Sequence, residues 1–129
     1  MSAVCIAPAR PAARVALGAL AVALLAAAIA VVAATDAGWP WVAATVMAPD
    51  VALLLGAGRC LEPGRLHPRA VPLYNALHHP AGPIALAALC AAGLLGPGPL
   101  AAALAWGFHI AMDRAAGYGL RTRSGHQAR

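Results

Sequence analysis

The stretch VALGALAVALLAAAIAVVAAT, residues 15–35, contains 21 residues and no charged side chain. At 1.5 Å per residue, a helix of this length spans about 31 Å, which matches the hydrocarbon core of a bilayer. A cleavable signal peptide is the alternative, because Arg10 and Arg14 precede the run and small residues follow it. The apolar part of a signal peptide is usually only about 7 to 15 residues long. The run therefore predicts a retained transmembrane helix.

The composition of the whole chain also indicates a membrane protein. Of the 129 residues, 62% are apolar and 10% are charged, against about 25% charged residues in ordinary soluble proteins. A soluble domain of this size must cover its remaining surface with polar side chains, which this sequence lacks. The three cysteines are widely spaced and odd in number, so they suggest neither a disulfide framework nor a CxxC site. We expect a single membrane domain over residues 1–129, with the lipid bilayer as its main partner.

Three further apolar segments follow the first one. The four predicted spans cover approximately residues 14–35, 39–58, 71–95 and 100–120. Pro49 interrupts the second span, and Pro80 and Pro83 break the third; lipid tolerates such breaks when neighbouring helices satisfy the freed carbonyl groups. The Gly-Pro-Gly-Pro turn at residues 96–99 is short, so it predicts that the third and fourth spans are antiparallel neighbours. The expected fold class is all-α, an integral membrane four-helix antiparallel bundle.

The arginines orient the predicted bundle. Two precede the first span, three lie in the loop 59–69, three follow residue 120, and the other two connections have none. Cytoplasmic loops carry the excess of positive charge, so both termini and the central loop should be cytoplasmic, in a multi-pass protein of the cell (inner or plasma) membrane. The formal charge of +5 raises nucleic acid as a partner. The arginines lie at the ends of apolar runs without a recognition motif, and we expect neither a nucleic-acid nor a soluble partner.

Polar side chains inside the predicted spans lie at similar depths. The separation from the nearest arginine at a span end is nine residues for Asp50, nine for His78, eight for Asp113 and twelve for His109. These separations correspond to depths of about 12 to 18 Å. A charged residue in mid-membrane costs about 2.5 to 3.5 kcal/mol, so these side chains should face one another or water. The candidate polar cluster consists of Asp50, Asn75, His78, His109, Asp113 and Arg114. His78 and His79 point about 100° apart on a helix, so one of the two should join it.

Three roles for this cluster remain open at this stage. Asp50, His78, His109 and Asp113 are a ligand set for Zn or a related divalent metal, the candidate cofactor, which would suggest a membrane-embedded metal-dependent hydrolase. Asp and His side chains can instead relay protons or line a path for a small solute. Four helices leave little room for a pore, so a relay or transport role implies a homo-oligomer. The third role is a hydrogen-bonded network that fixes helix register, at about 0.6 kcal/mol per interhelical contact. Neither catalytic residues nor a substrate follow from the sequence.

Three short blocks of sequence carry a family resemblance. They are Ala-Pro-Asp at 48–50, Tyr-Asn-Ala-Leu-His at 74–78, and the pattern W-x-x-H-I-x-x-D-R-x-x-G-Y-G-L at 106–120. In this order they resemble a small bacterial membrane family catalogued as domain of unknown function 4260. The resemblance implies a four-helix membrane protein of unassigned activity. It also singles out the same six residues of the candidate polar cluster.

Overall fold

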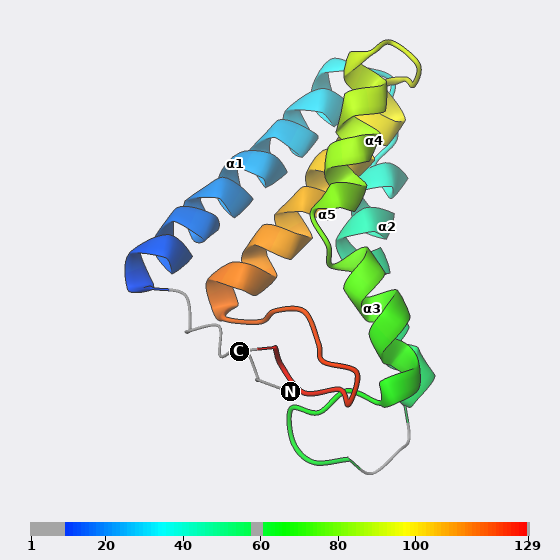
Figure 1. The fold of residues 1–129 in the computed structure, drawn as a ribbon. Coiled ribbons are helices and arrows are strands. Elements are labelled where there is room, and N and C mark those ends of the chain that lie inside the picture. Colours follow the sequence, from blue (N-terminus) through cyan, green and yellow to red (C-terminus); the bar gives the residue numbers. More distant parts are fainter. Residues whose placement is uncertain (1–9, 58–60, 129) are drawn as a thin grey trace.

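The computed structural model describes residues 10–57 and 61–128, and these residues form an all-helical fold (Figure 1). Its elements are α1 (Pro11–Ala34), α2 (Pro40–Met47), the 3-10 helix η1 (Ala48–Gly56), the short 3-10 turn η2 (Pro68–Ala70), α3 (Val71–Leu77), α4 (Ala81–Ala91) and α5 (Pro97–Ala116). The only β pairing within the described residues is an isolated bridge between Arg121 and Gln127. The predicted all-α class is confirmed. Gly58, used above to end the second span, and Arg59 and Arg129, used to orient the chain, lie outside the described residues.

The helices form four legs that alternate in direction (Figure 1). The first leg is α1, the second is α2 with η1, the third is α3 with α4, and the last is α5. The beginning of α1 therefore lies beside the end of α5, where Arg14 Nε donates a hydrogen bond of 2.8 Å to the carbonyl of Ala115. Helix α5 contacts α1, α2 and α4, so it is the central element of the fold.

Small side chains allow the helices to approach closely around α5. Five of its alanines are buried, at positions 101, 102, 103, 105 and 111. One core cluster joins Ala28 and Val32 of α1, Val42 of α2, and Ala101 and Ala105 of α5. Helices that meet through small residues gain van der Waals contact along their backbones, which is how helices associate in lipid, where the hydrophobic effect does not drive them together.

The second and third legs are broken where the sequence places prolines. Helix α2 ends at Met47, and the chain continues as the 3-10 helix η1 from Ala48. In the third leg α3 ends at Leu77 and α4 begins at Ala81, immediately after Pro80. Proline has no N–H for the hydrogen bond to the carbonyl four residues earlier, and its ring clashes with that carbonyl. Both breaks therefore have a local cause.

Helix α5 is shifted from the predicted span 100–120. It begins at Pro97, a favoured first helical residue, and ends at Ala116 because Gly117 adopts the left-handed conformation with φ 96°. Tyr118 N–H then bonds the carbonyl of Asp113 at 2.8 Å, as in a Schellman cap. After this cap the tail folds back towards the central loop, where Leu66 N–H bonds the carbonyl of Gly125 at 2.9 Å.

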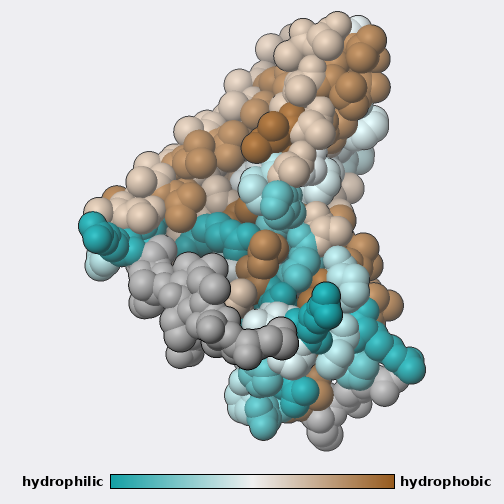
Figure 2. Space-filling model, viewed as in Figure 1, coloured by the Kyte–Doolittle hydropathy of each residue, from teal (hydrophilic) through white to brown (hydrophobic). Residues whose placement is uncertain are grey.

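Much of the surface is apolar. Among the described helices α1 is the one that is long and apolar enough to cross a membrane, and only 17% of its most apolar stretch is buried. Large apolar side chains are also exposed elsewhere, including Leu54 of η1, Ile84 of α4 and Leu94 in the turn after α4, each at least 66% exposed. Figure 2 shows this apolar surface over the upper part of the molecule and the hydrophilic surface below it.

We expect Gly82→Ala to destabilise the fold. A Cβ atom at Gly82 would overlap the indole ring of Trp106, with 2.7 Å to Cζ2. Overpacking of this kind costs typically about 1–3 kcal/mol. Thermal unfolding in detergent micelles measures the effect. Gly18→Ala is the matched control, because its Cβ would meet only an ordinary contact of 3.9 Å with Ala115. Equal unfolding temperatures for the two variants would contradict the close approach of α4 and α5.

Candidate metal centre

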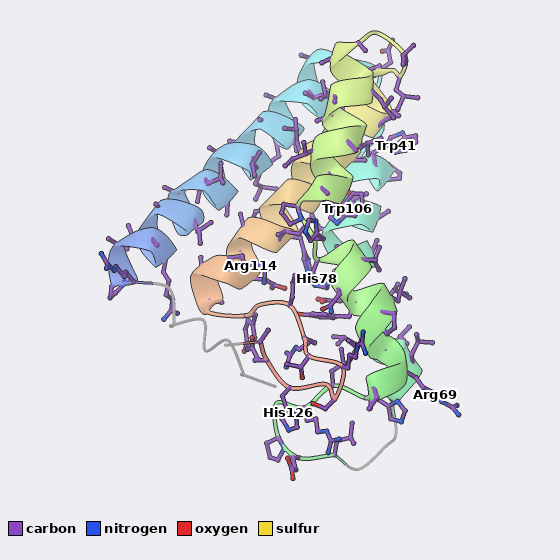
Figure 3. All side chains as sticks on the ribbon, in the orientation of Figure 1. Trp41, Arg69, His78, Trp106, Arg114 and His126 are labelled. Atoms are coloured by element: carbon purple, nitrogen blue, oxygen red, sulfur yellow. The ribbon has the colours of Figure 1, made fainter. Side chains whose placement is uncertain are left out.

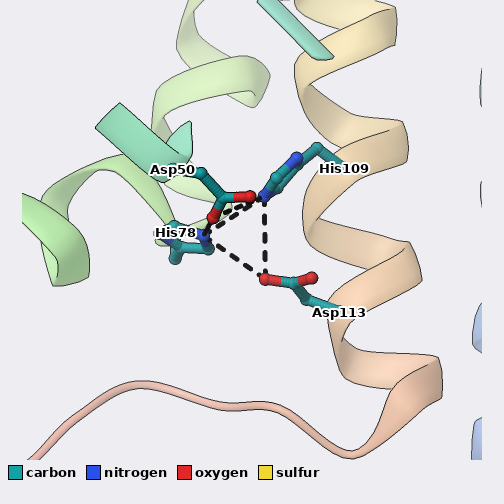
Figure 4. A group of neighbouring side chains, drawn as sticks. All are labelled: Asp50, His78, His109 and Asp113. Atoms are coloured by element: carbon teal, nitrogen blue, oxygen red, sulfur yellow. Dashed lines mark hydrogen bonds and ion pairs between the residues drawn. The ribbon is translucent and has the colours of Figure 1, made fainter. Parts of the chain in front are cut away.

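Four side chains from three legs converge on one point (Figure 4). Asp50 comes from the first turn of η1, His78 follows the last residue of α3, and His109 and Asp113 lie one turn apart on α5. One potential ligand atom of each residue lies within 4.8 Å of those of the other three. The choice between the adjacent histidines is resolved, because His78 is buried and joins the group, whereas His79 is exposed.

The separations between these atoms suit a tetrahedral metal ion. The two imidazole Nε2 atoms are 3.2 Å apart. His78 Nε2 lies 3.5 Å from Asp50 Oδ1 and 3.3 Å from Asp113 Oδ2, and the same distances for His109 Nε2 are 3.5 Å and 3.7 Å. Ligands that surround Zn tetrahedrally at about 2.0–2.1 Å are about 3.3–3.4 Å from one another. Five ligand–ligand separations thus fall close to the spacing that such an ion requires.

Both imidazole rings are held in the orientation that a metal ligand needs. His78 Nδ1 lies 2.8 Å from the carbonyl oxygen of Tyr74, and His109 Nδ1 lies 2.7 Å from that of Val46. A carbonyl only accepts hydrogen bonds, so each Nδ1 carries the proton, and in the neutral ring Nε2 presents its lone pair. Two such lone pairs facing each other at 3.2 Å repel unless a proton or a cation lies between them. Metal-binding histidines commonly have their second nitrogen fixed in this way.

Both carbonyl groups lie where a helix ends or changes its hydrogen-bonding pattern. Val46 lies at the change from α2 to the 3-10 helix η1, and Tyr74 lies in the last turn of α3. The carbonyl of Tyr74 accepts the N–H of His78 at 2.9 Å and uses its second lone pair for the ring of the same residue. The carbonyl of Val46 lies three residues before Pro49, which has no N–H to offer it. The break at Pro80 supplies the carbonyl of Leu77, which accepts a 2.7 Å bond from Trp106 Nε1. The breaks near Pro49 and Pro80 therefore leave the carbonyls of Val46 and Leu77 free to bond the side chains of His109 and Trp106.

The cluster is closed on one side and open on the other. The side chains of His78 and His109 are 2% and 10% exposed, while those of Asp113 and Asp50 are 27% and 46% exposed. The histidines thus lie against the protein interior, and the carboxylates lie at the open side. Catalytic zinc sites keep a coordination position open to water or substrate, whereas structural sites are enclosed.

Charge also matches a divalent ion. With neutral imidazoles, Asp50 and Asp113 give the cluster two negative charges, which a divalent cation neutralises. Arg114 is close by but does not contact the carboxylates. Its Nη2 and Nη1 donate 3.2 Å bonds to the carbonyls of His78 and Tyr118. Figure 3 shows Arg114 and His78 at the same level of the molecule.

Asn75 has a different position from the other predicted residues. Its Nδ2 donates a 2.8 Å bond to the carbonyl of Arg121, and its Oδ1 accepts a 2.7 Å bond from the N–H of the same residue. The amide therefore fastens the C-terminal tail to α3. It is not one of the four side chains whose potential ligand atoms meet.

Some supporting residues were not identified from the sequence. The ring of Tyr74 stacks on that of His78, with centroids 3.9 Å apart and 17° between the planes. The four-residue spacing predicts that Tyr74 and His78 share a helix face, but it does not assign the tyrosine a supporting role. Arg121 lies over the same tyrosine, 5.5 Å from its centroid, and Trp106 bonds the carbonyl that precedes His78. No local signal indicates these two, because each reaches a residue far away in the chain.

Comparison with known proteins gives one positive result. The sequence model of the family described as domain of unknown function (DUF4260) matches residues 15–128. The match includes all four converging side chains and the folded tail. No curated protein and no solved structure gives a significant match to this chain.

We expect Asn75→Ala to release the tail without unfolding the helices. The variant loses both hydrogen bonds to the backbone of Arg121, each worth about 1 kcal/mol, so opening of the tail should become about tenfold more frequent or more. Limited trypsin digestion, with cleavage after Arg121 and Arg123 followed by mass spectrometry, measures this. Leu73→Ala, at an exposed position of the same helix, is the control. Unchanged cleavage would mean that the bonds between the tail and residues 64–66 of the central loop hold the tail without Asn75.

Proposed function

The chain belongs to the family described as domain of unknown function 4260, and from this premise we propose that it is an integral membrane metalloenzyme. In this proposal Asp50, His78, His109 and Asp113 bind one divalent metal ion. The ion serves hydrolysis of a substrate that reaches it from the open side of the cluster. The proposal has two parts, the membrane embedding and the metal centre, which rest on different observations.

The exposed apolar surface supports the membrane embedding. A helix such as α1 in a soluble protein would be mostly buried, but only 17% of its most apolar stretch is covered by the rest of the chain. Large apolar patches on a surface mark contact with a membrane or a partner. The second apolar segment, Pro40–Gly56, is shorter, and a leg built from two helical pieces can still cross if protein covers the break.

The orientation of the two histidines is the observation that carries the metal centre. Each Nδ1 is fixed on a carbonyl, both Nε2 lone pairs face the same point, and two carboxylate oxygens lie within 3.7 Å of them. A register-fixing network would gain more from direct N–H to carboxylate bonds, at about 2.7–2.9 Å. The longer spacings leave room for an ion at the centre.

Each group of the chain has a chemical role in this proposal. An ion such as Zn, held by these residues, would supply a water molecule with its pKa lowered to about 7 and thus a nucleophile for hydrolysis. His78 and His109 fix the position of the ion against the interior. Asp50 is the more exposed carboxylate, so it is the ligand that would give up its position to a water molecule, leaving three protein ligands, and would then accept the proton that this water loses. Arg114 places a positive charge beside His78, where it can bind an anionic part of the substrate.

A proton relay is the second candidate function. The 3.2 Å distance between the two Nε2 atoms also fits a hydrogen bond in which one imidazole is protonated, with Asp50 and Asp113 stabilising the positive charge. Histidine and aspartate at membrane depth serve as proton relays in pumps and transporters. The metal content of the purified protein separates this candidate from the hydrolase.

The membrane embedding has a direct topological test. We expect green fluorescent protein fused after residue 129 to fluoresce, and alkaline phosphatase fused after Gly96 to be active, because the first folds in the cytoplasm and the second needs the outer side. The swapped fusions are the controls and should be inactive. If both positions report the same side, the multi-pass topology is wrong.

The metal centre is tested by elemental analysis. We expect protein purified in detergent without a His tag to contain about one divalent ion per chain, measured by inductively coupled plasma mass spectrometry for Zn, Mn and Fe. Replacing a residue that supports a metal ligand costs about 10–100-fold in affinity, so loss of a ligand in His78→Ala or Asp113→Ala should cost more. His79→Ala is the matched control, because His79 is the exposed neighbour that makes only a local bond to Ala81 N–H.

The metal contents of the wild type and the variants distinguish the hydrolase from the proton relay. Metal in wild type and His79→Ala but not in His78→Ala or Asp113→Ala would support the metal centre and justify a screen of ester, amide and phosphoester substrates. Absence of metal from all samples after incubation with each ion would rule out the hydrolase. A proton flux in proteoliposomes that depends on Asp50 or Asp113 would then support the relay.

A further inference from the structure

A second site lies on α5, away from the metal centre. It is an apolar groove of about 510 Å³ between α1 and α4, with α5 as its floor, a size typical of ligand pockets. Three leucines of α1 form one wall, and the other wall consists of Pro80, Pro83, Ile84 and Ala87. Among the residues that the structure describes, Arg114 is the only charged one that lines it. In Figure 2 the apolar surface continues down to a hydrophilic region above the grey atoms.

Arg114 connects the end of this groove to the metal centre. It directly follows the candidate ligand Asp113, and its Nη2 donates a hydrogen bond to the carbonyl of His78, another candidate ligand. The lining residues Gly107 and Ile110 lie on a different face of α5 from His109 and Asp113, because successive residues turn by about 100°. The groove and the metal centre are therefore separate cavities that meet at one side chain.

The charge of Arg114 identifies the kind of occupant. Within the described residues no carboxylate forms an ion pair with it, since all the ion pairs found there join a histidine to an aspartate or glutamate. Its two hydrogen bonds go to backbone carbonyls, and a guanidinium has five N–H donors, so others remain. An unpaired cation at the polar end of an apolar groove is complementary to an anionic amphiphile.

We propose that this groove binds one alkyl chain of an anionic membrane lipid, with the lipid headgroup on Arg114. From Ala103 to Arg114 the groove floor covers 11 residues of helix, about 16 Å, which accommodates most of a membrane acyl chain. The groove lies between two legs with exposed apolar side chains, so lipid can enter it sideways from the bilayer. The headgroup then lies beside the backbone of His78, so its ester bonds are within reach of the metal centre.

This inference rests on the proposed membrane embedding, but it does not require a bound metal. It extends the proposed function by naming anionic lipid as the substrate class. A second copy of the chain, seated through one of its helices, is the other occupant that an apolar groove could take. Such a contact would leave the charge of Arg114 unneutralised in an apolar interface, which is costly.

Native mass spectrometry of the full chain from nanodiscs tests the proposal. With equimolar phosphatidylglycerol and phosphatidylcholine in the nanodiscs, we expect one retained lipid per chain and about a fivefold preference for phosphatidylglycerol, the factor that corresponds to about 1 kcal/mol for one arginine. Arg114→Gln should reduce the preference to about one. Ala87→Trp should fill the groove and remove the retained lipid of either kind.

Matched controls and parallel measurements separate the alternatives. Arg123→Gln, in the exposed tail, and Ala88→Trp, the exposed neighbour of Ala87 on α4, should behave like wild type. Circular dichroism and size-exclusion chromatography check that each variant folds. If Arg114→Gln does not fold, the comparison of lipid retention in Ala87→Trp and Ala88→Trp tests the proposal. Metal content in the same samples and carbonate-resistant membrane association test the two parts of the proposed function separately.

Several results would overturn the proposal. These are no retained lipid in wild type, equal retention of the two lipids, or retention that survives both Arg114→Gln and Ala87→Trp. A dimer that dissociates in Ala87→Trp while lipid retention is unchanged would instead identify the groove as a contact between two copies. If the protein contains no metal but retains lipid as expected, the proposal of a hydrolase is wrong and the proposal of a lipid site is supported.

Discussion

The hydrogen bonds from two histidine Nδ1 atoms to backbone carbonyls are the interactions on which the candidate site depends. Without the carbonyls of Tyr74 and Val46, neither His78 nor His109 would have a fixed tautomer, and their Nε2 atoms would not face one another. Regular helices pair each carbonyl with an N–H group one turn ahead, which occupies one of its two lone pairs. The carbonyl of Tyr74 keeps this pairing and also bonds the ring of His78. Near Pro49 and Pro80 part of the pairing is lost, and His109 and Trp106 of α5 bond the carbonyls of Val46 and Leu77. Helix breaks that would weaken an isolated helix thus serve the geometry of the whole bundle.

Helix α5 connects the features described above. One of its faces carries His109 and Asp113, another forms the floor of the apolar groove, and buried alanines along it bring α1 and α2 close. Arg114 lies between the two faces and contacts the backbone of His78. A single rigid helix therefore fixes the distance between a candidate metal centre and a candidate lipid site. Rigid elements hold reactive groups more accurately than loops do.

The C-terminal tail belongs to the same architecture. Its turn at Gly117 directs the chain back over α3, where Asn75 binds the backbone of Arg121. Arg121 in turn lies over Tyr74, whose ring stacks on His78. The tail thus covers the residues behind the cluster, although it contributes none of the four converging side chains. This explains why an amide three residues before His78 does not join the cluster itself.

Local features of the sequence determined the helical class, the interruptions at Pro49 and Pro80, and the pairing of His109 with Asp113. Each of these depends on groups within about one helical turn, so spacing along the chain suffices to predict it. The depth argument also selected Asp50 and His78 as neighbours of that pair, and their role as metal ligands remains a prediction. Only the tertiary structure decided that His78 and not His79 faces the cluster, that Asn75 binds the tail, and which carbonyls hold the imidazoles. These outcomes depend on how far each leg rotates about its axis, which is set by the packing of small side chains between legs that are far apart in sequence.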